Sequence, residues 1–538
     1  MSTAYSPVNS GQAGGVAGGL RLRVRPFQLA IFTIVALLIG LPLLAGTERR
    51  AQVRQYIATT ALGGSSLVHP SLANHIAPPS GGIPDSDGIP LTLEARLSDL
   101  LKRPALDQYE AELQNRYSCP MFTFARNTYF FHEGKDQGWH SISKADVTRY
   151  RQKMVDYFRD LDRRNVPLVW DRSMAKGTPG SKRRGIIYTG SGMGKDLARM
   201  TVSLHFLRNV VKSKLPVEIY HYPGEFDNST AREELKTKFN VDIREVSVRK
   251  TDGKQWLIKN TAFIESQFTQ FVYMDSDNYP LADPEELFES VEFKQSGSVF
   301  WADLNKDHPD NAIWRVLGRT CSDEQWPAES GQVVFDKSGN KGLNLAVLHL
   351  SNHMMDNSDM YGNLGYGDKD TYRYAFYALG LDYQQAPRLF SSVGGYQRQD
   401  GTSSPDYFCG HSMIQWGLTP PSEKQNPNYR PKPAFLHTIL LKHRYGLQPE
   451  KLFSHVKRPR RDFILDPTLV RTLYEFTGDC FAITLKGPDG LPGEPNSILD
   501  GQGTVVETTE ETLSRNPGVW NELAHVAAFL AGLNIPGT

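Results

Sequence analysis

The sequence predicts an α/β protein built on a mixed, mostly parallel sheet that is flanked by helices. Short apolar segments with strand character alternate with helical patterns between residues 185 and 274, and this alternation is typical of βαβ units. The last of these segments, Phe271–Met274, leads directly into Asp275 and Asp277. Because open α/β sheets bind ligands at the carboxyl ends of their strands, this carboxylate pair is expected at the ligand edge.

The elements are expected in a regular order along the chain. Apolar periodicity around Leu97–Leu101 and around Met154–Phe158 predicts helices that pack on the core or brace it. From residue 185 onward the pattern changes to strands and helices in turn. Strands are expected at 185–189, 217–221, 241–248 and 271–274, and helices at 197–211, 230–239 and 256–266.

Residues 27–45 contain no charged side chain. As a helix they would span roughly 28 Å, enough to cross a bilayer, so we expect a transmembrane anchor here. Arginines flank the segment on both sides, and the positive-inside rule therefore favours neither orientation. A cleaved signal peptide is the alternative, although the polar lead is long for one. Both interpretations place the rest of the chain in the secretory lumen.

The anchor divides the chain into segments of different character. Residues 1–26 are expected to form a disordered cytoplasmic tail, and residues 46–92 a Pro/Gly-rich stem. A helical extension is expected at 93–180 and the α/β domain at 181–483. Residues 484–538 are expected to be a mostly disordered tail, apart from a short helix at 520–533.

Composition excludes some classes of function. Lys and Arg number 60 against 59 Asp and Glu, for a net charge of +1, so bulk electrostatics give no reason to expect nucleic-acid binding. The four cysteines form no Cys-x-x-Cys pair, which disfavours a structural zinc site. They permit two disulfides in any of three pairings. Asn228 begins the one N-glycosylation sequon of the chain, in a predicted polar turn.

The Asp275–Asp277 pair is distinguished from other Asp-x-Asp sequences by its strand. The pattern also occurs at 85–87, 160–162 and 368–370. The first copy lies in a Pro/Gly-rich run, and the second lies among arginines on a helical pattern, which indicates a charged surface. Two carboxylates at the end of a buried strand can instead hold Mn²⁺ or Mg²⁺, which in turn binds a nucleotide diphosphate.

The glycine-rich run Gly190–Lys195 does not have the spacing of a phosphate-binding P-loop. Thr189 stands where that motif needs its first glycine, and Asp196 follows the lysine in place of Ser or Thr. A glycine-rich turn between a strand and its helix still permits close backbone approach to a nucleotide.

Several further residues are candidates for the site. Asp303 follows an apolar strand and could face a sugar, or could simply cap the strand end. Glu329 precedes another strand and could bind sugar hydroxyls, or bond within its own loop. Asp370, or Asp368 two residues before it, could orient substrate or act as the N-cap of the following helix. His437 could be a third metal ligand or a satisfied core histidine. Lys442 and Arg444, close behind it, could neutralise a diphosphate.

Together these segments resemble the fungal Golgi α-mannosyltransferase family that extends mannan, particularly its branch-initiating α-1,2 type, with a terminal α-1,3 type also related. The resemblance spans roughly residues 183–446, and the order of the motifs is more specific than any one of them. The segments that carry it are Gly185–Ile187, Leu207–Arg208, Leu215–Ile219, Ile258–Lys259 with Ala262, Met274–Phe288, Phe300–Asp303, Ala328–Gln332, Tyr366–Phe376 and Phe435–His437 with Lys442.

The resemblance implies a GT-A fold, GDP-mannose as donor, Mn²⁺ or Mg²⁺ as cofactor, retention of anomeric configuration and a type II Golgi anchor. The acceptor would be a glycan or mannoprotein, and assembly with other Golgi transferases is left open. Its implied site roles are catalysis by Asp275, Asp277, Asp303, Glu329 and Asp370, donor binding by Lys259, Asp275, Asp277 and Lys442, and metal binding by Asp275, Asp277 and His437.

Two other functions fit the same residues. A lumenal GT-A transferase that uses a UDP-sugar would share the metal strand. A non-catalytic Golgi glycan-binding or scaffold protein would share the fold, although it would have no need of the metal ligands. A covalent route through a carboxylate such as Glu329 is a further alternative to attack of the acceptor on the face that GDP leaves.

Overall fold

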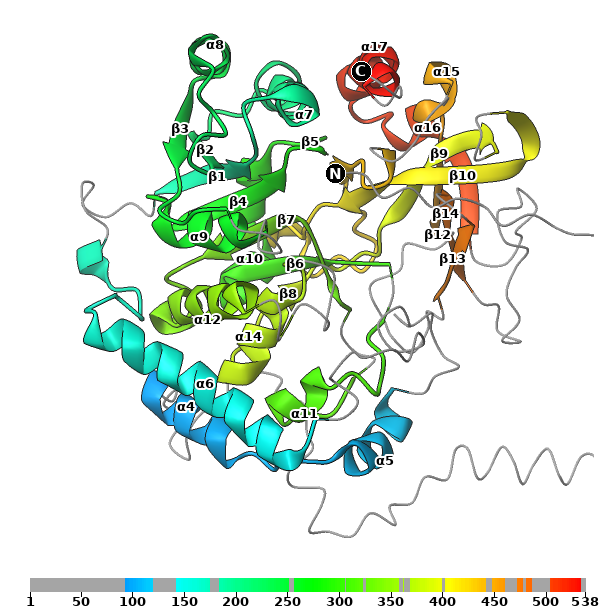
Figure 1. Ribbon diagram of the computed structural model, residues 1–538. Helices are drawn as coiled ribbons and strands as arrows, with labels where there is room; N and C mark the ends of the chain where they lie inside the picture. The colour runs from blue at the N-terminus through cyan, green and yellow to red at the C-terminus, as the bar shows by residue number, and fades with distance from the viewer. Residues whose placement is uncertain are drawn as a thin grey trace, which may run out of the picture. The chain divides into compact units, whose positions relative to one another are not determined.

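The computed structural model is shown as a ribbon in Figure 1. It describes residues 92–119, 142–174, 183–250, 256–304, 306–322, 326–357, 361, 368–398, 402–441, 448–459, 472–477, 480–485 and 504–533. The predicted anchor, tail and stem at 1–91 lie outside these residues. In the part of the chain that is described, no helix combines the length and apolarity that a membrane crossing requires.

The core of the protein is a mixed sheet in which four neighbouring strands are parallel. Its order is β3-β2-β1-β4-β7-β6-β8, with β1 to β4 parallel to one another, β7 antiparallel to both of its neighbours, and β8 parallel to β6. The mixed, mostly parallel prediction is therefore confirmed. The strands are β1 (Arg184–Thr189), β2 (Val217–His221), β3 (Val241–Glu245), β4 (Gln270–Asp275), β6 (Ser298–Ala302), β7 (Ala328–Asp336) and β8 (Gln384–Gln385).

Strand alternation divides the core between the two faces of this sheet. In β4, Phe271 and Tyr273 face one apolar cluster while Val272 and Met274 face the other, as the two-residue period of a strand requires. The first cluster is covered by α9 (Leu257–Glu265), α12 (Asn344–Asp356) and α14 (Thr371–Leu379), and the second by α7 (Gly194–His205), α8 (Ser229–Phe239) and α10 (Val291–Ser296) (Figure 1).

A second, antiparallel sheet follows in the chain and was not expected from the sequence. Its main path runs β13-β14-β10-β9-β12-β15. A short strand after the metal motif joins it, because β5 (Asn278–Pro280) pairs with β11 (Pro433–His437) and β11 pairs with β10. The remaining strands are β9 (Ser391–Gln397), β10 (Ser403–Trp416), β12 (His455–Pro459), β13 (Thr472–Thr477), β14 (Cys480–Leu485) and β15 (Thr504–Thr508).

The end of the chain is more ordered than expected. Residues 504–533 form β15, α16 (Thr509–Thr512) and α17 (Pro517–Gly532). Helix α17 confirms the short helix expected at 520–533, whereas β15 and α16 lie where a disordered tail was expected. Strand β15 pairs with β12, and Val519, Leu523 and Leu530 of α17 are buried in the apolar cluster of the second sheet. Strand β15 was not predicted because the segment is rich in Gly, Pro, Glu and Thr, and because its partner β12 lies about 50 residues earlier in the chain.

The helical extension is fastened to the core by arginines as well as by apolar contacts. It contains α4 (Leu93–Lys102), α5 (Gln108–Ser118) and α6 (Lys144–Arg163). Buried Arg151 of α6 donates to carbonyls at the end of α11 (Ile313–Leu317), and buried Arg96 of α4 donates to carbonyls at the end of α14. A cation at a helix C-terminus satisfies carbonyls that lack partners within the helix. The short helical turns are η2 (Arg172–Met174), η3 (Phe206–Val210), η4 (Pro284–Glu289), η5 (Asn340–Gly342), η7 (Pro421–Glu423) and α15 (Pro449–Leu452).

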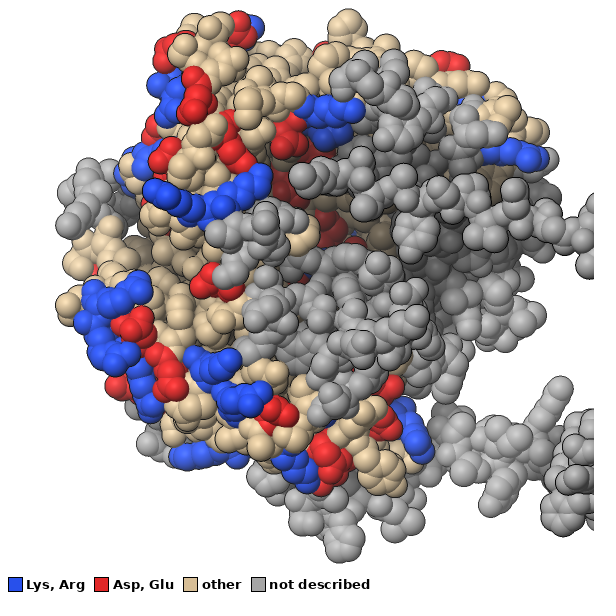
Figure 2. All heavy atoms as spheres, in the orientation of Figure 1, with Lys and Arg blue, Asp and Glu red and all other residues tan. Residues whose placement is uncertain are grey.

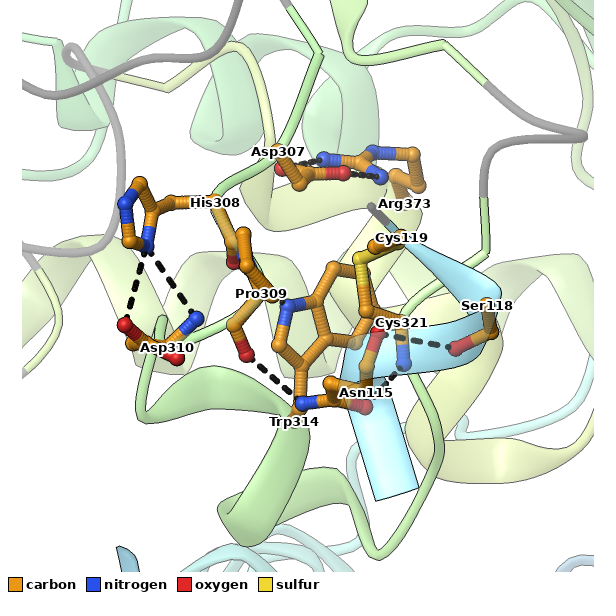
Figure 3. Close-up of a disulfide and its surroundings, with 10 residues drawn as sticks. All are labelled: Asn115, Ser118, Cys119, Asp307, His308, Pro309, Asp310, Trp314, Cys321 and Arg373. Atoms are coloured by element: carbon orange, nitrogen blue, oxygen red, sulfur yellow. Dashed lines mark hydrogen bonds and ion pairs between the residues drawn. A yellow bond between two sulfur atoms is a disulfide. The ribbon is translucent and has the colours of Figure 1, made fainter. Parts of the chain in front are cut away.

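All four cysteines form disulfides, and the structure selects one of the three pairings. Cys119 bonds Cys321, and Cys409 bonds Cys480. Figure 3 shows the first bond, which ties the end of α5 to the loop after α11. Beside it, Asn115 of α5 donates to the Pro309 carbonyl and accepts from the Cys321 N–H. The bond therefore holds the extension against the core across 202 residues of sequence.

Acidification should destabilise this fold through two buried histidines of α12. Burial lowers the pKa of His349 and of His353 to about 4, from 6.5. As the pH falls, the unfolded chain binds these protons near pH 6.5 and the folded chain only near pH 4. The stability they contribute is therefore intact above pH 6.5 and lost progressively below it. We expect a loss of roughly 2 kcal/mol per histidine at pH 5.

Urea unfolding of the wild type and of His353→Gln between pH 7.5 and pH 5 measures this effect. The variant should lose less stability on acidification than the wild type does. His525→Gln, which replaces an exposed histidine of α17, is the matched control and should follow the wild type. An identical pH dependence in wild type and His353→Gln would contradict the assignment.

Candidate active site

A cleft of about 500 Å³ opens where the parallel strands end. It lies over the carboxyl ends of β1, β2 and β4, which is the edge that the sequence predicted. Figure 2 shows acidic side chains gathered in a hollow on one face of the molecule. The residues that line the cleft are Thr189, Gly190, Ser191, Asp196, Arg199, Tyr222, Glu225, Lys250, Trp256, Ile258, Lys259, Asp275, Ser276, Asp277, Ser330 and Asp368.

Asp275 is the last residue of β4, and its carboxylate is held by two groups at the sheet edge. The Tyr273 hydroxyl, two residues earlier on the same side of the strand, donates to Oδ1. Lys259, which α9 supplies from above the sheet, lies 3.1 Å from the same oxygen. Tyr273 is also hydrogen-bonded to Thr189 of β1, at 2.8 Å. These contacts fix the carboxylate before any ligand arrives.

Asp277 meets His437, which comes from the second sheet. The pairing of β5 with β11 places His437 opposite Asn278, and the imidazole Nε2 lies 3.3 Å from Asp277 Oδ1. One ligand atom each from Asp275, Asp277 and His437 lies within 4.8 Å of the others. The structure thus brings together the three residues that the sequence proposed as metal ligands.

Glu329 orients His437 from the opposite side of the ring. Its Oε1 lies 2.9 Å from His437 Nδ1 and also accepts from the Gly331 N–H, while the Gln332 side chain donates to Oε2. Because Nδ1 donates to this carboxylate, Nε2 is left to face Asp277. Glu329 is buried and lies outside the lining of the cleft among the described residues, an arrangement that favours a positioning role over that of a nucleophile.

Gly331 makes the contact between Glu329 and His437 possible. A Cβ at this position would lie 2.4 Å from His437 Nδ1 and 2.9 Å from Glu329 Oε1, both far inside van der Waals contact. Asn278 of β5 donates to the Gly331 carbonyl and to the Gln332 side chain, at 2.7 Å each. The Glu-Ser-Gly-Gln segment therefore holds the His437 ring in place, and the absence of a side chain at Gly331 leaves room for that ring.

The residues present fit a divalent cation. Two carboxylates and a neutral imidazole are suitable ligands for Mn²⁺ or Mg²⁺, and buried His437 Nε2 accepts no hydrogen bond from any residue that the structure describes. Burial lowers the pKa of His437, but the neighbouring Glu329 and Asp277 carboxylates outweigh it and raise this pKa to about 10. The carboxylates thus favour positive charge at this position, and a cation bound to Nε2 would displace the proton that the ring otherwise carries there.

Lys259 and Asp368 form a second charged pair on the floor of the cleft. Lys259 Nζ lies 3.1 Å from Asp368 Oδ2, as well as close to Asp275. Burial lowers the pKa of Lys259, yet the two carboxylates raise it overall, so the ammonium stays charged. Burial and the nearby Asp275 raise the pKa of Asp368. Both residues line the cleft. The family resemblance implied Lys259 as a donor-binding residue, and Asp368 was considered beside Asp370 as a helix cap or a substrate-orienting carboxylate.

Asp303 and Asp370 lie outside the described lining of this cleft. Asp303 pairs with Lys369, and Asp370 Oδ1 lies 2.9 Å from Arg373, which also binds Asp307 through both of its terminal nitrogens. Figure 3 shows Arg373 and Asp307 beside the Cys119–Cys321 disulfide. Asp370 occupies the N-cap position of α14, but its side chain makes no capping hydrogen bond. The two aspartates thus belong to a buried ion network next to the site.

The structure also describes Asn228 and the Asp160–Asp162 pair, which lie away from the cleft lining. Lys442 and Arg444 lie outside the described residues. Asn228 is exposed and accepts from the Ala231 N–H as the N-cap of α8, a bond that an attached glycan would leave in place because glycans are linked through Nδ2. The Asp160–Asp162 pair lies on the surface of α6, where Asp160 contacts Arg163 and Arg164, as expected.

The sequence has a clear relation to known mannosyltransferases. Residues 183–318 and 317–417 match the model of a family described as "Mannosyltransferase putative". The matched range includes Asp275, Asp277 and Glu329. It ends before His437.

Relatives of known activity are similar over about half of the chain. Alpha-1,2-mannosyltransferase MNN21 of Candida albicans is 24% identical over 347 residues, which cover 52% of this chain and 50% of the relative. Alpha-1,2-mannosyltransferase MNN2 of Saccharomyces cerevisiae is 25% identical over 322 residues, which cover 51% and 50%. The chain thus spans about half the length of the curated relatives it matches.

Solved glycosyltransferases are only distantly similar. The galactosyltransferase LgtC, in complex with donor and acceptor sugar analogs, has a TM-score of 0.27 and 11% identity over 38% of this chain and 73% of its own. The glycosyltransferase GlyE of Streptococcus pneumoniae TIGR4 has a TM-score of 0.25 and 12% identity over 38% and 45%.

Replacing Gly331 by alanine should weaken cation binding. The added Cβ displaces the imidazole of His437, and we expect a 10- to 100-fold loss of Mn²⁺ affinity, the usual cost of disturbing the support of a metal ligand. Titration with Mn²⁺, followed by electron paramagnetic resonance, measures this affinity. Gly532→Ala, where a Cβ meets nothing within 4 Å, is the control. Unchanged affinity in Gly331→Ala would show that His437 does not bind the cation.

Proposed function

We propose that this protein is an α-mannosyltransferase that transfers mannose from GDP-mannose to a mannose-containing glycan, with a divalent cation as cofactor. The observation that carries the proposal is the Asp275–Asp277–His437 cluster at the ligand edge of the mixed sheet. It is supported by the match of residues 183–417 to a mannosyltransferase family model. We further propose a GT-A fold, retention of anomeric configuration and an α-1,2 linkage, in keeping with the names of the relatives.

The donor diphosphate would lie against the cation ligands. A cation held by Asp275, Asp277 and His437 would neutralise the charge of the departing diphosphate. Lys259 adds a fixed positive charge at the same edge, since its ammonium lies 3.1 Å from Asp275. Because these groups are already held by Tyr273, Asp368 and Glu329, little reorganisation accompanies donor binding.

The acceptor hydroxyl would attack on the face that GDP leaves, which gives retention. A covalent intermediate on Glu329 finds no support, because both of its oxygens are engaged by His437, Gly331 and Gln332. Asp368 is a second carboxylate of the cleft that lies 3.1 Å from Lys259, and it is not one of the candidate cation ligands. We assign it to holding a hydroxyl of the transferred sugar. Asp303 and Asp370 would act indirectly, through the network that positions α14.

The proposed location is the Golgi membrane, with residues 27–45 as a type II anchor and the catalytic domain in the lumen. Both disulfides support an oxidising compartment, because cytosolic proteins rarely keep such bonds. The exposed sequon at Asn228 is compatible with it. The acceptor would be a mannoprotein or another mannose-bearing glycan, and assembly with other Golgi transferases is part of the same proposal.

A panel of GDP- and UDP-sugars tests the donor directly. The purified protein is incubated with Mn²⁺ and each donor, with and without α-mannobiose, and nucleotide release is measured. We expect acceptor-stimulated release from GDP-mannose alone. Release from a UDP-sugar would instead point to another metal-dependent transferase. Nucleotide binding without turnover of any donor, over a range of mannose acceptors, would favour a non-catalytic glycan-binding protein.

Replacing the two proposed cation-binding aspartates by asparagine should abolish turnover without unfolding the protein. In Asp275→Asn/Asp277→Asn, the cation loses its two anionic ligands, and we expect a fall of at least about 1,000-fold in GDP-mannose turnover. The chain supplies a matched control in Asp160→Asn/Asp162→Asn, which changes an Asp-x-Asp pair on the surface of α6 and should leave turnover unchanged. Near wild-type turnover in the first variant would exclude the metal assignment.

A further inference from the structure

The cleft continues beyond the cation ligands to a second group of side chains. Tyr222 and Glu225 follow β2, Lys250 follows β3, and Trp256 directly precedes α9, and all four line the same cleft as Asp275. They come from two neighbouring connections at the carboxyl edge of the sheet. Neither the cation nor the diphosphate accounts for an aromatic face, a carboxylate and an ammonium at this end.

The distance between the two ends suits a nucleoside diphosphate. In the sheet, β1 lies between β2 and β4, so the ends of β2 and β4 are about 10 Å apart at ordinary strand spacing. A diphosphate bound beside β4 and a ribose across the Thr189–Ser191 turn would therefore bring the base to the end of β2. The base end of the cleft is thus the region of Tyr222, Glu225, Lys250 and Trp256.

Glu225 is firmly placed at this end. Its N–H donates to the Tyr222 carbonyl at 3.1 Å, and its own carbonyl accepts from Gly192 of the glycine-rich turn at 2.8 Å. Gly192 is required for this close approach, because a Cβ there would lie 2.6 Å from the ring of Phe226. The Glu225 side chain is 20% exposed and lies 2.6 Å from Lys250 Nζ. A carboxylate and an ammonium thus stand side by side in the cleft.

Trp256 supplies the aromatic surface. It is 44% exposed, which makes it one of the few large apolar side chains at the surface of the described chain, and it faces a cleft in which charged groups predominate. An exposed indole in such a place offers a flat face on which a base can stack, an interaction that favours purines for their larger ring area.

We propose that Glu225 and Lys250 recognise the Watson–Crick edge of guanine and so select GDP-linked donors. Guanine presents the O6 acceptor next to two donors, N1–H and the N2 amino group. A carboxylate accepts from both donors, and the adjacent ammonium donates to O6. Uracil offers one N–H between two carbonyl oxygens, and a carboxylate repels these oxygens. Adenine and cytosine each present a ring acceptor where guanine presents N1–H. The proposal rests on the donor site proposed above, and it identifies the residues that set its base specificity.

Nucleotide affinities of the full-length protein test this inference. Isothermal titration in the presence of Mn²⁺ compares GDP, UDP and IDP, whose base is guanine without the amino group. We expect the wild type to bind GDP at least about 10-fold more tightly than IDP, the effect of one hydrogen bond to a charged acceptor. In Glu225→Gln that ratio should fall close to one, with GDP affinity lowered at least about 10-fold and Mn²⁺ affinity without nucleotide unchanged.

A control and two outcomes separate this inference from the donor proposal. Glu233→Gln, at an exposed position of α8, should keep the wild-type ratio. A wild type that binds UDP more tightly than GDP would overturn the GDP-linked donor and this inference together. A wild type that prefers GDP to IDP, with the same preference in Glu225→Gln, would overturn only the role of Glu225. Thermal melts show whether each variant is folded.

Discussion

The antiparallel pairing of β5 with β11 is the contact on which the site depends. It sets His437 opposite Asn278, one residue after Asp277, and so carries an imidazole from the second sheet to the carboxylates that end β4. In the same arrangement, the Glu329 carboxylate lies against Nδ1 of the His437 ring. A one-residue slip of the pairing would turn His437 to the opposite face. The two sheets are therefore joined where the chemistry is expected to occur, and the stability of one sheet bears on the candidate metal ligands of the other.

Most of the first sheet could be predicted from the sequence, and the second could not. Strands 185–189 and 217–221 are present as β1 and β2 with near-identical bounds, because buried parallel strands are short apolar runs between helical patterns. The second sheet consists of strands such as β9 and β10 that carry many Ser, Gly and polar residues, some of them buried. These two strands pair with each other, but their other partners β11, β12 and β14 follow later in the chain. Because the strands lack a regular apolar alternation, no local pattern predicts them.

The site shows the same division. Asp275 and Asp277 were predictable because a strand leads into them, and Lys259 followed from the family resemblance. His437 was a hypothesis that needed β11 to bring it near, and the support by Glu329 and Gly331 depends on side-chain geometry that a linear sequence does not contain. Asp303 and Asp370 also end a strand and begin a helix, yet Lys369 and Arg373 hold them in a network of their own. Position at an element boundary therefore indicates a candidate, and the neighbours decide its role.

The central claim is that Asp275, Asp277 and His437 hold one divalent cation that carries the donor. Anomalous diffraction at the manganese edge, from crystals grown with Mn²⁺ and GDP, tests it most directly. The account predicts a single strong peak in the cleft, about 2 to 2.4 Å from an oxygen of each aspartate and from His437 Nε2, in contact with the GDP diphosphate. GDP bound in the cleft with no manganese at these residues, or with manganese bound away from His437, would contradict it.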